Sequence, residues 1–157
     1  LSASLGGLVW AQAVAGQPDI KSLDDLIGLI PKEAARDIDK KSKQEDAARA
    51  ISEALRNSAF RKTATFDLVL DFWQPWGERG TAAYRLKPLL EERKEKGVRF
   101  RIGMWIMAPR DSGPVIEKLK KGDKFEVTGQ LTRADFTVSE GPTLHLDVED
   151  ATVTVKK

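Results

Sequence analysis

The sequence of 157 residues predicts a mainly β domain preceded by a short helical extension. Three observations support this fold class. Residues 63–157 contain stretches in which apolar and polar side chains alternate, which is the pattern of half-buried strands. A short helical stretch interrupts these strands and ends at Gly122, directly before a long alternating stretch. Residues 19–59 repeat apolar side chains with helical spacing instead.

Composition limits the class of protein. Hydrophobic residues make up 41% of the chain, which is enough for one core, and charged residues make up 32%, which excludes a membrane-embedded chain. The net charge is only +2, so affinity for nucleic acid would have to come from local clusters of basic side chains. Because the chain has no cysteine and a single histidine, His145, we expect no metal and no cofactor.

The first 18 residues form a separate apolar segment. A short apolar run is followed by small-x-small triplets at residues 11–13 and 13–15, similar to the end of a secretory signal peptide. The run is too short to span a bilayer. This pattern slightly favours a secreted or periplasmic protein. A segment that packs on the domain, in a cytoplasmic protein, is the alternative.

Residues 19–60 are predicted to form a two-helix extension. Ser22 is a suitable N-cap with an acidic residue three positions later, and Pro31 stops or restarts this helix. A second helix, over about residues 43–58, begins with a capping box at residues 42–45. The charged segment between them, residues 32–41, is either a helical turn or a mobile linker.

Residues 61–157 form the predicted β domain, and its first strand spans residues 63–73. Strict alternation places one set of apolar side chains on the inner face, namely Phe66, Leu68, Leu70 and Phe72. On this parity Trp73 lies on the outer face. Residues 74–80 are a turn by composition.

The second and third strands flank a charged stretch. Residues 81–90 form the second strand, bent or broken at Pro88, because proline cannot donate a hydrogen bond to a strand ladder. Residues 91–97 are predicted to be a charged loop, with a short helix as the alternative. The third strand spans residues 98–107, and its inward residues are Val98, Phe100, Ile102, Met104 and Ile106.

A short helix over residues 114–121 is predicted to close one end of the strands, with Gly122 at its C-cap position. The fourth strand, residues 124–136, contains Gly129 in its interior, which indicates a bulge or a sharp coil. The last strand spans residues 143–155 and is predicted to bulge near Asp150.

This order of elements, with a helix before the fourth strand and a Gly122-Asp123 entry into it, resembles the OB-fold, a five-stranded Greek-key barrel. The resemblance covers about 60% of the chain and includes no motif of a particular subfamily. It implies binding of oligonucleotides, oligosaccharides or proteins on the outer face of strands two and three. Another small β-barrel, or an α+β sheet covered by the two helices, is the alternative fold.

Basic and aromatic side chains are predicted to lie on this outer face and in the loop after the first strand. The candidate ligand-binding residues are Trp76, Arg79, Arg85, Lys87, Arg99, Arg101 and Trp105. Cations neutralise phosphates, and aromatic rings stack on unpaired bases at about 1–3 kcal/mol per base. Two alternatives remain. The outward Asp67 and Asp71 could pair with the arginines of strand three, and the N-terminal helices could cover Trp73 and Trp105.

The sequence therefore predicts a binding module and not an enzyme. His145 lies on the last strand, as an exposed histidine with no nucleophile indicated beside it, and outward carboxylates on strands usually serve as solvated charges. The predicted ligand is single-stranded nucleic acid or another oligomer such as an oligosaccharide. The alternative is an exported protein-interaction or structural domain of the cell envelope, which has no nucleic-acid role and contacts a protein partner through its N-terminal helices.

Overall fold

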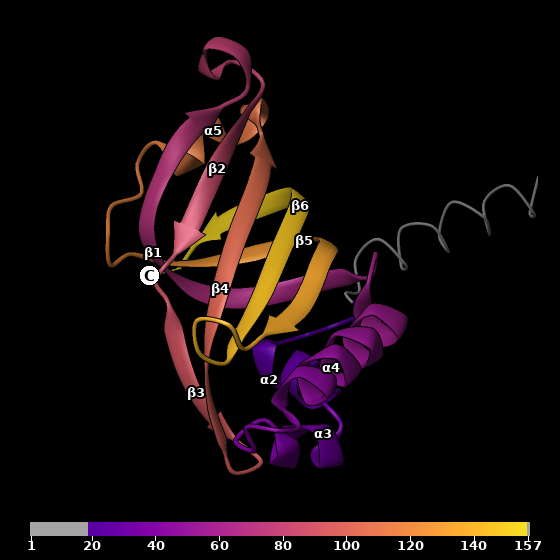
Figure 1. Cartoon of the computed structure of the whole chain (residues 1–157). Helices are drawn as coiled ribbons and strands as arrows, with labels where there is room; N and C mark the ends of the chain where they lie inside the picture. Colours follow the sequence, from indigo (N-terminus) through magenta and orange to yellow (C-terminus); the bar gives the residue numbers. More distant parts are fainter. Residues whose placement is uncertain (1–18, 157) are drawn as a thin grey trace, which may run out of the picture.

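The computed structural model describes residues 19–156 and shows a mainly β fold with helices packed at one end of a curved sheet (Figure 1). The strands are β1 (Thr63–Trp76), β2 (Ala83–Pro88), β3 (Glu91–Glu95), β4 (Val98–Pro109), β5 (Lys124–Thr137) and β6 (Thr143–Val155). The helices are α2 (Leu23–Ile27), α3 (Lys32–Asp37), α4 (Gln44–Ala59) and α5 (Gly113–Ile116), and two short 3-10 helices are η1 (Glu78–Gly80) and η2 (Arg110–Ser112).

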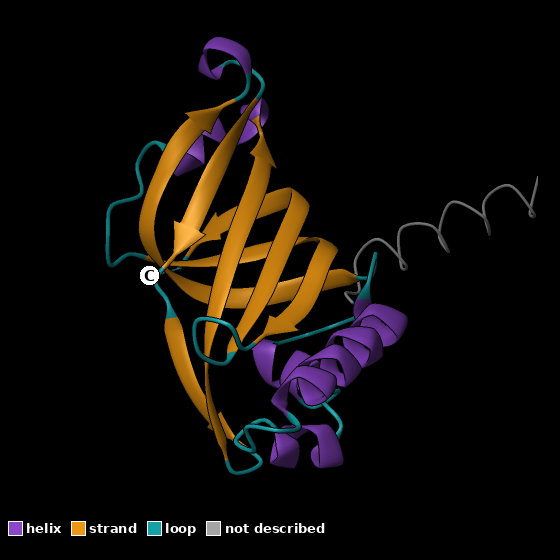
Figure 2. Cartoon of the chain, viewed as in Figure 1, coloured by secondary structure: helices purple, strands orange, loops and turns teal. Residues whose placement is uncertain are grey.

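The six strands form one sheet that closes partly into a ring. Their order is β2-β1-β5-β6-β4-β3, and an additional pairing joins β2, at one end of this order, to β4, the last strand but one. The ring therefore consists of β1, β2, β4, β6 and β5 (Figure 2). β4 and β6 run parallel, and the other pairs are antiparallel.

The sixth strand corrects the prediction of five. Residues 91–97, expected to be a charged loop or helix, form β3 and a tight turn, and β3 pairs with β4. The turn residues Lys96 and Gly97 have φ values of 51° and 83°. Positive φ at both central positions is the geometry of the two-residue hairpin turns that match strand twist, and glycine favours it at the second position. This turn brings β3 back alongside β4, although the charged residues of β3 are unusual for a strand.

Side-chain alternation and backbone irregularities agree with the sequence in β4, β5 and β6. The predicted inward residues of β4 are all buried. The predicted helix over residues 114–121 is shorter than expected, because α5 ends at Ile116 with Glu117 as its C-cap. The C-cap prediction for Gly122 is therefore wrong, and Gly122, with a φ of 92°, lies in the turn that leads into β5. The β5–β6 register shifts between Thr128 and Gln130, on either side of Gly129, and Asp150 has a φ of 51°. Both predicted bulges are therefore confirmed.

The N-terminal extension contains three helices, because Pro31 restarts the chain as α3 over part of the predicted linker. The Ser22 cap is confirmed, with its Oγ accepting from the Asp25 N–H at 3.0 Å. The capping box at residues 42–45 is wrong, since Lys43 occupies the N-cap position without a side-chain hydrogen bond. The apolar face of α4 packs on β5, and Asp24 of α2 pairs with Arg93 of β3.

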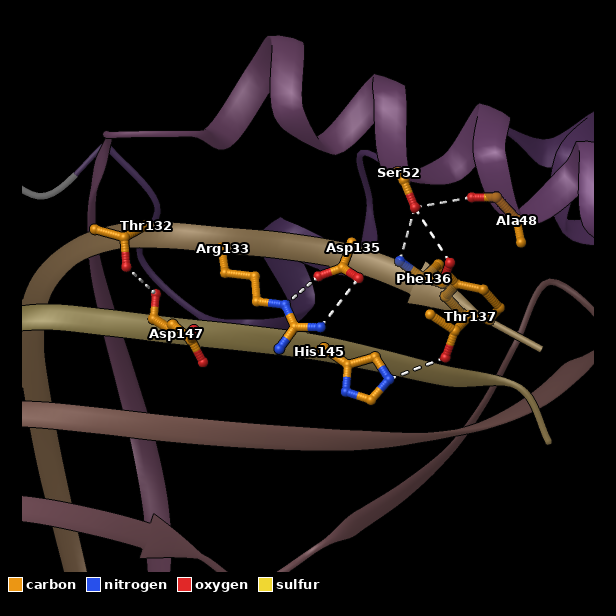
Figure 3. Close-up of polar contacts among 9 residues, drawn as sticks. All are labelled: Ala48, Ser52, Thr132, Arg133, Asp135, Phe136, Thr137, His145 and Asp147. Carbon is orange, nitrogen blue, oxygen red and sulfur yellow. Dashed lines mark hydrogen bonds and ion pairs between the residues drawn. The ribbon is translucent and has the colours of Figure 1, made fainter. Parts of the chain in front are cut away.

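Ser52 of α4 ties this helix to the end of β5 (Figure 3). Its Oγ accepts from the Phe136 N–H at 2.8 Å and can donate to the Ala48 carbonyl at 2.9 Å. Replacing Ser52 with alanine leaves the Phe136 N–H without this partner, so we expect a loss of about 1–2 kcal/mol in the free energy of unfolding. Urea denaturation measures this loss. Ser58→Ala, at an exposed position of the same helix, is the control and should change stability by less than about 0.5 kcal/mol.

Within residues 19–156, the helices are all too short or too polar to cross a bilayer. The signal-like segment of residues 1–18, on which the secreted or periplasmic prediction rests, lies outside the described residues.

Candidate functional site

Arg85 lies between two tryptophan rings on the outer face of the sheet. Its guanidinium carbon is 3.4 Å from the centroid of the Trp105 ring and 4.3 Å from that of Trp76. Lys87, the next outward residue of β2, holds its ammonium nitrogen 4.6 Å from the Trp105 ring. Cations over aromatic faces are attracted by the negative face of the ring. The sheet thus gathers four of the predicted ligand-binding residues.

Phe72 completes this group because β1 contains a bulge. The β1–β2 register shifts between Leu70 and Phe72. After Leu70, each side chain of β1 therefore lies on the face opposite to the one that strict alternation predicts. Phe72 is 41% exposed and forms an edge-to-face contact with Trp105, with 6.0 Å between the ring centroids. We call Phe72, Trp76, Arg85, Lys87 and Trp105 the cation–aromatic cluster.

The same bulge turns Trp73 inward, so the predicted positions of Phe72 and Trp73 are both wrong. The Trp73 indole N–H donates to the Leu119 carbonyl at 3.1 Å, and its ring meets Tyr84 edge to face. Trp73 and Trp105 contact residues of neighbouring strands and of the segment after α5. The N-terminal helices pack on β5 and β3 instead, so the prediction that they cover both rings is wrong.

A hollow of about 320 Å³ opens beside the cluster. It is lined by Trp76, Arg85, Trp105, Met107, Arg133, Asp147 and Glu149. Cross-strand register explains this set. Trp105 is paired with Asp147 of β6, and Asp147 is paired with Arg133 of β5. The outer face therefore changes from aromatic and cationic on β2 and β4 to acidic on β6.

The two basic side chains of β2, Arg85 and Lys87, form no ion pair within residues 19–156. Burial, and then the neighbouring Arg85, lower the pKa of Lys87 from its ordinary value, although Asp147 and Asp71 oppose this shift. Arg133 is paired instead, since it donates to both oxygens of Asp135 at 2.5 and 3.3 Å. An anionic ligand would therefore find its unpaired cations on β2.

The remaining predicted residues lie outside the cluster. Arg79 is exposed in η1, and Arg99 pairs with Glu92 of β3 at 3.6 Å, a surface pair of small energetic value. Arg101 donates to the Glu140 carbonyl at 2.7 Å and so supports the β5–β6 turn. The expected pairing of Arg99 and Arg101 with acids of β1 is wrong. Asp67 pairs with Lys156 at 2.8 Å, and Asp71 pairs with Lys121 at 3.3 Å.

Sequence reasoning did not include Phe72 of the cluster or four residues that line the hollow, namely Met107, Arg133, Asp147 and Glu149. Phe72 was placed inside because strict alternation cannot reveal a bulge. Asp147 and Glu149 alternate with the inward residues of the last strand, but only the parallel β4–β6 pairing brings them beside Trp105. None of these positions carries a local signal along the chain.

His145 is half-buried, not exposed as predicted, and its Nε2 lies 2.9 Å from the Thr137 Oγ1 (Figure 3). Burial, and then the charge of Arg133, lower the pKa of His145 below its ordinary value of 6.5. As the pH falls, His145 is therefore protonated in the unfolded chain before it is protonated in the folded protein. The contribution of the neutral His145 to stability is complete above pH 6.5 and is lost as the pH falls below that value.

We expect His145→Gln to flatten the pH dependence of stability below pH 6.5. The measurement is urea denaturation of both proteins at pH 7.5 and at pH 5. Because other groups also titrate in this range, the informative quantity is the difference between the two proteins. The wild type should lose more stability than the variant, and equal losses would contradict a lowered pKa at His145.

The sequence matches no family model and no curated protein. Solved structures with similar backbones include a small single-stranded DNA-binding protein from Streptomyces coelicolor, with a TM-score of 0.38 and 15% identity over 61% of this chain and 94% of that one. A putative aspartyl-tRNA synthetase from Leishmania major Friedlin has a TM-score of 0.39 and 7% identity over 65% of this chain and 19% of that one. Pot1pC from Schizosaccharomyces pombe, bound to single-stranded DNA, has a TM-score of 0.28 and 9% identity over 63% of this chain and 81% of that one. At these values the likenesses assign no family.

Proposed function

We propose that this protein is a non-enzymatic binding module for single-stranded nucleic acid, built as an OB-like Greek-key barrel with an additional hairpin strand. The ring of strands with its parallel β4–β6 pair, and the helix α5 placed before β5, support this architecture. The proposed binding surface is the cation–aromatic cluster on β1, β2 and β4.

The observation that carries the proposal is the position of Arg85 between Trp76 and Trp105. Its guanidinium carbon lies 3.4 and 4.3 Å from the two ring centroids, and the N–H groups of a guanidinium can donate to a phosphate. Trp76 is 41% exposed, so part of its ring is open to an unpaired base. Single-strand binders combine cations that follow the backbone with rings that stack on bases. The cluster offers both within one surface.

Titration with a single-stranded 12-nucleotide DNA, followed by tryptophan fluorescence at 50 and 200 mM salt, tests the proposal. We expect saturable quenching and an affinity that falls with salt. Each phosphate contact on a single strand contributes about −0.7 to the slope of log K against log salt, so Arg85 and Lys87 together contribute about −1.4. A hairpin duplex of the same composition is the control. It should bind more weakly, because its bases are already stacked.

The absence of quenching at 50 mM salt, where electrostatic attraction is stronger, would overturn the proposal. A neutral oligosaccharide serves as the second ligand in the same assay. Binding of the sugar without salt dependence would assign the tryptophans to carbohydrate. If neither ligand binds, the protein-interaction module of the cell envelope becomes the better hypothesis.

A further inference from the structure

The hollow beside the cluster has two chemically different walls. Trp76, Arg85 and Trp105 form the side toward β2, and the side toward β6 contains Asp147 and Glu149. Its volume of about 320 Å³ lies at the lower end of the range for small-ligand pockets. A single planar group stacked on an indole ring is a suitable occupant.

The carboxylates on the β6 wall are free to accept hydrogen bonds. Among residues 19–156, no lysine, arginine or histidine lies within ion-pair distance of Asp147 or Glu149. The neighbouring Arg133 is already bound to both oxygens of Asp135. An ionised carboxylate has only acceptor oxygens, so it repels phosphate and attracts N–H groups.

The two walls would orient a bound strand. Phosphates are attracted to Arg85 and Lys87 on β2 and are repelled by the acids on β6. A base attached to such a phosphate can enter the hollow, stack on a tryptophan and turn its polar edge toward β6. Because Asp147 is the direct cross-strand neighbour of Trp105, its carboxylate lies beside the ring on which the base would stack.

We propose, on the basis of the proposed function, that Asp147 and Glu149 select bases that carry an exocyclic amino group, so that cytosine binds better than thymine. Cytosine presents an N4 amino donor, which aspartate and glutamate accept, whereas thymine presents the O4 acceptor at the same position. Thymine offers a single N3–H between two carbonyl oxygens, and these would face the carboxylates unfavourably. The two pyrimidines have rings of the same size, so the comparison isolates the polar edge.

The experiment measures fluorescence anisotropy of labelled dC12 and dT12 with the full chain at pH 7.5. We expect dC12 to bind at least fivefold more tightly than dT12. The double variant Asp147→Asn with Glu149→Gln should bind both strands more tightly, because two negative charges are removed. Its dC12/dT12 affinity ratio should fall toward one, since an amide can donate to the thymine O4 as well as accept.

A matched control carries the same charge change on another surface. Glu45→Gln with Asp46→Asn, both exposed on α4, should leave the dC12/dT12 ratio at the wild-type value. Equal wild-type affinities for dC12 and dT12, or an unchanged ratio in the Asp147 and Glu149 variant, would overturn the selection and leave single-strand binding intact. If neither strand binds, the proposed function fails as well.

Discussion

Replacement of Trp105 with alanine should weaken single-strand binding by roughly 5- to 150-fold. This range corresponds to the 1–3 kcal/mol of one stacked base. The centroid of the same ring lies 3.4 Å from the Arg85 guanidinium carbon and 4.6 Å from the Lys87 ammonium nitrogen. Removal of the ring therefore also removes the contact that holds each cation in place. Because the charges themselves remain, the salt dependence of binding should persist. Anisotropy of a labelled 12-nucleotide strand measures the affinity without relying on the removed fluorophore.

Trp73→Phe is the matched control for this variant. Trp73 faces the interior, where its indole N–H binds the Leu119 carbonyl, so the change should reduce stability by about 1 kcal/mol and leave affinity unchanged. Urea denaturation of both variants shows whether a loss of binding reflects unfolding. Unchanged affinity in a folded Trp105→Ala protein would remove the cluster from the proposed interface. A large loss of affinity in Trp73→Phe would place binding elsewhere.

Gly129→Ala should reduce the free energy of unfolding by about 3 kcal/mol, which is the upper end of the usual cost of overpacking. A Cβ at this position would lie 2.7 Å from the Glu149 carbonyl oxygen and 3.1 Å from the Ala151 Cα. Both neighbours are backbone atoms of the β6 bulge, so they cannot move aside as a flexible side chain would. The chain would have to open the β5–β6 pairing around the bulge. Urea denaturation, analysed for a change in midpoint at constant slope, measures the loss.

Gly103→Ala controls for the general effect of adding a methyl group to a strand glycine. A Cβ there would lie 3.6 Å from the nearest atom, a Leu90 methyl carbon, which is ordinary van der Waals contact. We expect a change of less than about 0.5 kcal/mol. Equal losses in the two variants would mean that the close approach at Gly129 relaxes without cost. That result would contradict a structural role for the β5–β6 bulge.

Several elements could be predicted because their signals are local. The alternation in β4, the bulge marked by Gly129 and the Ser22 cap depend on signals within a few residues, and each is confirmed. β3 could not be predicted from composition, since all five of its residues are charged. It forms because the Lys96-Gly97 turn folds the segment back on β4, where pairing outweighs strand propensity.

The candidate site could be predicted only in part. Spacing of two along β2 placed Arg85 and Lys87 on one face, as observed. Parity failed on β1, because one bulged residue exchanged the faces of Phe72 and Trp73. The outward orientation of Arg99 and Arg101 was foreseen, but their distance from the cluster along β4 and their contacts with Glu92 and Glu140 were not.

Four features could be predicted from the sequence alone: the mainly β class, most strand positions, the bulges of β5 and β6, and the presence of basic and aromatic side chains in β2 and β4. These features follow from side-chain periodicity and from the backbone preferences of glycine, which act over a few residues. Which side chains meet depends instead on how the strands pair in three dimensions. The β1 bulge and the parallel pairing of β4 with β6 place Phe72 and Asp147 beside Trp105, across more than 30 residues of chain in each direction. Such contacts depend on register between distant strands, and a one-residue shift in register moves every following side chain to the opposite face.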